Sequence, residues 1–124
     1  MNLVDSSGWL EYFAEGRNAG FFAPAIENTK LLLVSVVNCY EVFKRIAQQR
    51  DENTAMQAIA AMQEGALVDL SPDLAVAAAK IALELKLPMA DSIIFATAKM
   101  RRATLWTQDD DFAKLPDVKY VAKR

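Results

Sequence analysis

The 124-residue chain is 53% hydrophobic and 24% charged, with a formal net charge of −2. These values suit one globular domain over residues 1–124, and they exclude a disordered chain and an overall basic footprint for nucleic acid. The absence of histidine excludes a histidine general base, a Ser-His-Asp triad and the usual zinc sites, so hydrolytic chemistry would need carboxylates, hydroxyls, lysine or a metal held by oxygen ligands.

The sequence indicates a cytoplasmic protein with no membrane segment. No apolar run reaches the length of a membrane span, and the first residues lack the basic and apolar segments of a secretory signal. The single cysteine, Cys39, has no partner for an internal disulfide, which agrees with a reducing compartment.

The first half of the chain alternates β-type runs with helical patterns. A β-type run at residues 2–4 precedes a helical pattern, and a short helix is expected at residues 21–26. Residues 31–34 are continuously apolar, as in a strand buried on both faces. A helix then begins at Ser35 or Asn38 and ends near residue 50.

The middle of the chain continues the alternation. The pattern predicts a helix at residues 51–64 and a β-type run at residues 66–70. Ser71 and Pro72 suit the N-cap and first position of a helix that continues to about residue 86.

Residues 90–112 hold the most informative pattern of the chain. Asp91 opens a helix that is apolar nearly all round, and a β-type run at residues 104–107 follows it. Next come Asp109, two further aspartates and a phenylalanine, with one or two helical turns expected at residues 109–114 and a last strand at residues 118–121. An ionised carboxylate on an apolar arc is costly unless it is paired, hydrogen-bonded or bound to metal.

Together these elements predict an α/β fold. The alternation of β-type runs and helices indicates a three-layer sandwich, in which a central parallel sheet of four to five strands is flanked by helices. In such a sheet Asp5 and Asp109 both follow strands at one edge, and that edge also carries the helix starts near Asp91 and Glu41. Converging carboxylates repel one another, and Mg²⁺ or Mn²⁺ relieves that repulsion.

Local patterns also allow structural interpretations of two of these acids. Asp5, or Ser6 after it, suits the N-cap of the helix that follows. Glu41 lies off the apolar stripe of its helix, so periodicity alone predicts a solvated side chain.

The chain resembles the PIN-domain ribonucleases, and among them the VapC toxins of prokaryotic toxin–antitoxin pairs. The resemblance is carried by the opening DSSGWLEYF, by Asp91 at the head of an alanine-rich helix, and by the T-x-D-x-D-F pattern from Thr107 to Phe112. It covers nearly the whole chain. One departure is Arg102-Ala103, where a glycine is common in the family.

The resemblance implies a metal-dependent endoribonuclease and a role for each acid. Asp5, Asp91 and Asp109 would be metal ligands, and Glu41 would be a ligand or hold the attacking water. Two hydroxyls and one further acid would support them, the hydroxyls by orienting carboxylates: Ser6, Thr107 and Asp111. Asp111 suits an exposed first-turn aspartate equally well.

The implied partners are an RNA substrate, a cognate antitoxin protein and a second copy of the chain. The apolar helix faces at residues 36–47 and 55–62 exceed what one small sheet obviously needs, which favours a homodimer and a hydrophobic groove for the antitoxin. Lys99, Arg101 and Arg102 suit either RNA guidance or favourable charges at a helix C-terminus.

Two other functions compete with this hypothesis. A receiver-like phosphoacceptor domain would need an acidic pair after the first strand, whereas Asp5 is followed by serines. A catalytically inactive PIN-like module that only binds partners would keep the fold without turnover.

Overall fold

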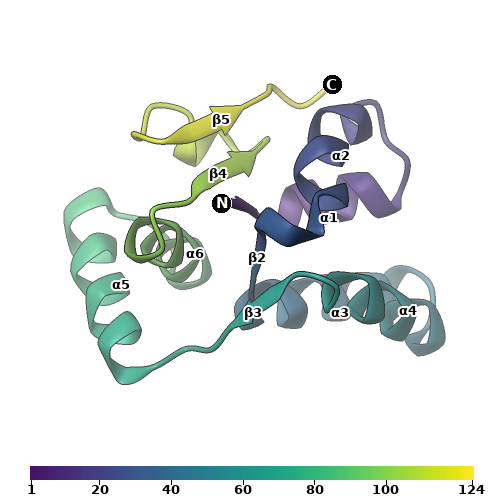
Figure 1. Ribbon diagram of the computed structural model, residues 1–124, viewed down its shortest axis with the longest axis horizontal. Helices are drawn as coiled ribbons and strands as arrows, with labels where there is room; N and C mark the ends of the chain where they lie inside the picture. The colour runs from purple at the N-terminus through teal and green to yellow at the C-terminus, as the bar shows by residue number, and fades with distance from the viewer.

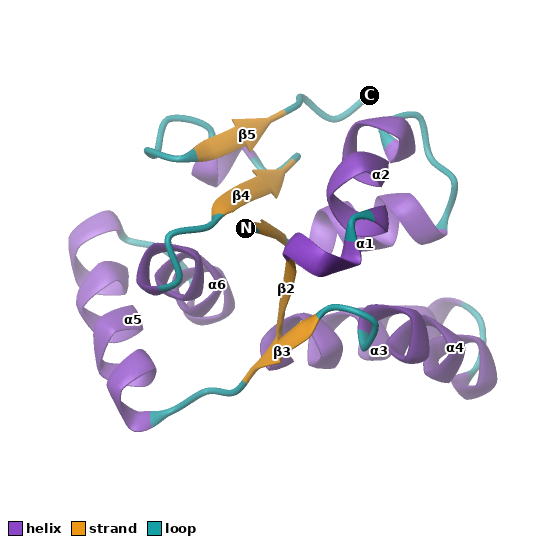
Figure 2. Cartoon of the chain, viewed as in Figure 1, coloured by secondary structure: helices purple, strands orange, loops and turns teal.

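The computed structural model describes residues 1–124 and shows a five-stranded, wholly parallel sheet, as the alternation predicts (Figures 1 and 2). The strand order is β3-β2-β1-β4-β5, so the first strand is central. Because all strands run the same way, their carboxyl ends share one edge. The strands are β1 (Asn2–Val4), β2 (Leu32–Ser35), β3 (Ala66–Val68), β4 (Thr104–Thr107) and β5 (Val118–Tyr120).

Six α-helices cover the sheet, with α5 and α6 on one face and α1 to α4 on the other (Figure 1). None of them has the length and apolarity that a membrane crossing requires. Two single turns of 3-10 helix complete the fold, η1 (Thr29–Leu31) and η2 (Asp110–Phe112). The helices are α1 (Ser6–Phe13), α2 (Ala19–Glu27), α3 (Val36–Gln49), α4 (Glu52–Met62), α5 (Pro72–Leu85) and α6 (Met89–Met100).

Alternate side chains of the three central strands, β2, β1 and β4, build a separate core on each face. On β1, Leu3 joins the core beneath α5 and α6, and Val4 joins the core beneath the other four helices. On β4, Leu105 and Trp106 divide in the same way. Burial on both faces explains why the central strands are continuously apolar in sequence.

The pairing of β1 with β4 fixes the edge at which the acidic residues lie. Val4 is in register with Trp106, and the Asp5 amide donates a 3.0 Å hydrogen bond to the Trp106 carbonyl oxygen. Asp5 therefore leaves the sheet beside Thr107, the last residue of β4. Three register pairs between β1 and β4 thus bring together residues about one hundred positions apart in the sequence.

The apolar helix faces that suggested a homodimer pack largely against each other within the protomer. Val42 and Ile46 of α3 share one buried cluster with Ala55 and Met62 of α4. Large apolar side chains are exposed on α5 instead, where Leu83 is 84% exposed. The apolar positions of α3 and α4 therefore give no support for a dimer interface, and the homodimer stays a prediction.

The turn between α6 and β4 explains the expected glycine. Arg102 has φ 53°, in the left-handed region that costs an L-residue about 1–2 kcal/mol. The turn lies at the amino edge of the sheet, where the Thr104 amide donates to the Met1 carbonyl oxygen over 2.9 Å. Arg101 and Arg102 are therefore about 15 Å along the helix from Asp91. That distance favours their role as helix-end cations.

Candidate metal centre

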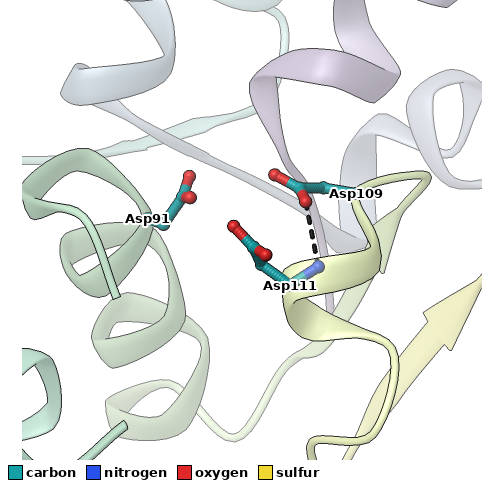
Figure 3. A group of neighbouring side chains, drawn as sticks. All are labelled: Asp91, Asp109 and Asp111. Atoms are coloured by element: carbon teal, nitrogen blue, oxygen red, sulfur yellow. Dashed lines mark hydrogen bonds between the residues drawn. The ribbon is translucent and has the colours of Figure 1, made fainter. Parts of the chain in front are cut away.

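Three aspartates face one another at the carboxyl edge of the sheet. Asp91 comes from the first turn of α6, and Asp109 and Asp111 come from the loop and 3-10 turn after β4 (Figure 3). One carboxylate oxygen of each lies within 4.8 Å of those of the other two. The turn itself produces this approach, because the Asp111 amide donates a 3.0 Å hydrogen bond to Oδ1 of Asp109.

Asp91 bears the electrostatic cost of the cluster. The pKa of its carboxyl rises from 3.8 to about 7, first because partial burial disfavours the charged form and then because Asp109 lies nearby. Glu41, Asp5 and Asp111 raise it further. Asp91 is thus within electrostatic reach of every other acid that the sequence assigned to the site.

Asp5 is buried and held by four hydrogen-bond contacts. It is the N-cap of α1, since Oδ1 accepts from the Gly8 amide at 2.9 Å. The Ser7 hydroxyl contacts both oxygens, at 2.8 and 3.0 Å, and the Thr107 hydroxyl donates to Oδ2 at 2.6 Å. Burial outweighs these bonds and, with the charge of Asp109, raises the pKa of Asp5 from 3.8 to about 6. Asp5 is therefore both the N-cap of α1 and a member of the acidic site.

The hydroxyl of Thr107 links two of the acids. It donates to Asp5, and it accepts a 2.9 Å hydrogen bond from the Asp109 amide. A fully buried threonine at the end of β4 thereby fixes the start of the loop that carries the aspartates.

Glu41 is held by a short chain of hydrogen bonds that periodicity did not reveal. The Ser6 hydroxyl donates to Oε1 of Glu41 at 2.7 Å, and Nδ2 of Asn38 donates to the Ser6 oxygen at 3.0 Å. Asn38 is completely buried, and its Oδ1 accepts from the Ser35 amide at 3.1 Å. The Ser35-x-x-Asn38 spacing, typical of a capping box, was the sequence signal that could have identified Asn38.

The site residues proposed from sequence occupy one region, but their grouping differs from the expected one. The cluster of ion-binding size comprises Asp91, Asp109 and Asp111, whereas Asp111 was expected only to support the ligands. Asp5 lies outside that cluster and is connected to it through the Thr107 hydroxyl, which bonds both Asp5 and the Asp109 amide. Its direct ligation of a metal stays a prediction. Asn38 and Ser7 were not predicted.

The donor set suits a hard divalent cation. Carboxylate oxygens are the ligands that Mg²⁺ and Mn²⁺ prefer, and neither histidine nor a thiol lies in the cluster. The raised pKa values of Asp5 and Asp91 show that the metal-free site disfavours their ionised forms. A bound cation would reverse that preference by pairing with the ionised carboxylates.

Known protein structures share this fold over most of the chain. A chain of a toxin–antitoxin complex from Klebsiella pneumoniae superposes with a TM-score of 0.78 at 24% identity, covering 96% of each chain. VapC20 of Mycobacterium tuberculosis, described as a sarcin-ricin loop cleaving toxin, gives 0.79 at 16% identity over 94% of this chain and 95% of its own.

A chain of VapBC2 from Rickettsia felis, bound to a DNA fragment from its promoter, gives a TM-score of 0.74 at 12% identity, covering 98% of this chain and 97% of that one. At these identities the likeness establishes the fold. No curated protein sequence matches the chain significantly. The family model of the PIN domain matches residues 3–118, and the chain belongs to the PIN domain family.

Proposed function

We propose that this protein is a metal-dependent endoribonuclease of the VapC type, the toxin of a toxin–antitoxin pair. The convergence of Asp91, Asp109 and Asp111, with Asp5 and Glu41 close enough to raise the pKa of Asp91, carries the proposal. Membership of the PIN family and the likeness to chains from toxin–antitoxin complexes support it. A further similar structure, VapC20, is described as a sarcin-ricin loop cleaving toxin.

Asp91, Asp109 and Asp111 would hold Mg²⁺ or Mn²⁺, and Asp5 would be a further ligand. Such an ion lowers the pKa of a bound water and stabilises the charge that develops on a phosphodiester during hydrolysis. The chain's own contribution is to fix the ligands before substrate arrives. Thr107 couples the position of Asp5 to that of Asp109, and the apolar packing of α6 fixes the backbone of Asp91.

Glu41 orients the attacking water in this proposal. Its Oε1 is engaged by the Ser6 hydroxyl, which leaves Oε2 to accept a proton or a hydrogen bond from water. The Ser6 proton is directed at Glu41 because the Ser6 oxygen already accepts from Asn38. The carboxylate is therefore aimed by two polar residues that hold no metal.

Two protein partners belong to the same proposal. A cognate antitoxin would neutralise the acidic site, with a basic side chain placed near Asp91. A second copy of the chain would cover the outer face of α5, where Val76 and Leu83 are seven residues apart and 56% and 84% exposed.

RNA cleavage in EDTA, Mg²⁺ and Mn²⁺ tests the function. We expect cleavage of single-stranded or loop RNA only with the divalent ion, and a loss of at least ~100-fold in Asp91→Asn, because a lost ligand removes transition-state stabilisation of several kcal/mol. Asp110→Asn is the matched control, since Asp110 is an exposed aspartate that precedes Asp111 in the η2 turn and lies outside the cluster.

Undiminished cleavage by Asp91→Asn would refute the assignment of the site. An antitoxin complex that forms normally around a protein without any nuclease activity would favour the inactive partner-binding module instead.

A further inference from the structure

An aromatic side chain lies exposed beside the acidic site. Tyr40 precedes Glu41 on α3, and 66% of it is exposed. The Lys44 ammonium lies 5.7 Å from the centre of its ring, one helical turn further along. This contact steadies the ring without burying it.

Tyr40 lines a hollow that opens directly from the site. The hollow has a volume of about 430 Å³, and it lies between the start of α1 and the outer face of α3. Ser6 and Glu41 belong to its wall, so the hydrogen-bonded pair of the site is also part of this surface. Lys44 and Arg45 give the same wall two cations against one acid.

A second hollow, of about 400 Å³, continues from the first. The two share Leu10 and Arg45, and the second adds Arg50 and Lys123. Its acid is Glu11, which three cations outnumber. The net charge of the whole chain is −2, so this concentration of positive charge is local.

We propose that these two hollows form one groove for single-stranded RNA, in which an unpaired base stacks on Tyr40 and the flanking phosphates lie on Lys44 and Arg45. We call it the α1–α3 groove, lined by Tyr40, Glu41, Lys44, Arg45, Arg50 and Lys123. This inference rests on the proposed nuclease function and names the form of RNA that its site accepts.

The chemistry of the groove selects this ligand. Cations that track a backbone, combined with an exposed aromatic face, are the means by which proteins hold single strands without reading sequence. A duplex keeps its bases stacked inside and offers Tyr40 no base face. An acidic peptide would satisfy the cations but would leave the ring unused.

Binding can be measured separately from cleavage in the Asp91→Asn background. The probe is an oligoribonucleotide of about 12 nucleotides carrying 2-aminopurine, followed by anisotropy and by quenching of the base on stacking. We expect Tyr40→Ala to weaken binding about 10-fold and to abolish the quenching, and Tyr40→Phe to preserve both. Tyr120→Ala, at another partly exposed tyrosine, should change neither.

The cations should act through charge alone. Lys44→Ala and Arg45→Ala should each reduce the slope of log affinity against log salt by about 0.7, the value for one phosphate contact on a single strand. Tyr40→Ala should leave that slope unchanged. Thermal unfolding of each variant confirms that these exposed substitutions leave the fold intact.

Two further probes decide what the ring recognises. With an abasic strand of the same length, Tyr40→Ala should bind as the parent does. An equal loss on the abasic strand, or an equal loss for poly-glutamate, would overturn base stacking and favour a general anionic or peptide site. Absence of binding to the single strand would overturn the groove.

The groove and the nuclease function fail differently. Tyr40-dependent binding by a protein that cleaves no RNA would leave the groove standing and refute the nuclease. Normal cleavage by the wild type, together with unchanged binding and cleavage in Tyr40→Ala, would refute the groove alone.

Discussion

Replacing Asp91 by asparagine should make the metal-free protein more stable. Asparagine has nearly the same shape as aspartate and cannot ionise, so the substitution removes charge without opening a cavity. The N-cap position of α6 is Pro88, which makes no side-chain capping bond, so the helix start does not depend on the Asp91 carboxylate as a cap. The substitution therefore removes the free-energy cost of ionising Asp91, which burial and four neighbouring acids impose.

The size of the effect follows from the raised pKa. A rise from 3.8 to about 7 corresponds to about 4 kcal/mol for a group shielded from solvent. Asp91 is only half-buried, and solvent screening reduces this to ~1–2 kcal/mol. An acid in the first helical turn also gains about 0.3–1 kcal/mol from the helix dipole, which asparagine forfeits. A net gain of about 1 kcal/mol remains, equivalent to ~4 °C in melting temperature.

The gain should depend on pH in a defined direction. Because the folded pKa of Asp91 lies above its unfolded value near 4, the native carboxyl is favoured in its protonated form. Its stability cost is absent below pH 4, grows as the pH rises and is complete above pH 7. Asp91→Asn should therefore exceed the wild type in stability at pH 8 and approach it at pH 4.

Thermal and urea unfolding in EDTA, at several pH values, measure this difference. Asp73→Asn is the matched control, because Asp73 is an exposed first-turn acid on α5 and should lose only its dipole contribution. Added Mg²⁺ should reverse the order, since a tenfold excess over its Kd stabilises the wild type by about 1.4 kcal/mol. If Asp91→Asn is less stable in EDTA at every pH, the carboxylate is a structural group and the reasoning fails.

Three other predictions concern parts of the molecule that carry no metal ligand. Asn38→Ala should lower kcat about tenfold at unchanged KM in steady-state cleavage kinetics, because Glu41 loses the group that directs the Ser6 hydroxyl toward it. If Asn38 were purely structural, the variant would instead yield less active protein with unchanged kcat per active molecule. Arg102→Gly should stabilise the protein by about 0.5 kcal/mol in urea unfolding, because it relieves a left-handed conformation, whereas Arg101→Gly next to it, at φ −94°, should destabilise it. Leu83→Glu should abolish a homodimer in light scattering without lowering the melting temperature, and a monomeric wild type at high concentration would contradict the dimer.

Most elements could be predicted because their signals are local. Ser71 and Pro72 begin α5 as expected, and the β-type run at residues 104–107 is β4. The start of α2 was placed two residues late, since Asn18 before it is fixed by distant partners. The side-chain Nδ2 of Asn18 donates at 3.0 Å to Oε1 of Gln108 and at 3.0 Å to the Ala122 carbonyl oxygen, contacts that no local pattern contains.

The grouping of the acids depended on geometry that spacing does not encode. One or two helical turns were expected after Asp109, and a single 3-10 turn forms; its tightness, which brings Asp111 to Asp91, is not encoded in the spacing. Glu41 looked solvated because its helix offers it no partner, and the partner is Ser6, thirty-five residues away. Helical periodicity also cannot say what covers an apolar face, which is why α3 and α4 suggested a dimer.

Direct binding of Mn²⁺ tests the central claim that Asp91, Asp109 and Asp111 form the metal centre. Calorimetric titration should give equal affinity for the wild type and Asp110→Asn, and an affinity at least about tenfold weaker for Asp111→Asn. The two variants differ by one position in the same turn, so general acidity cannot produce that contrast. Equal losses in both variants, or no binding by the wild type, would contradict the metal centre.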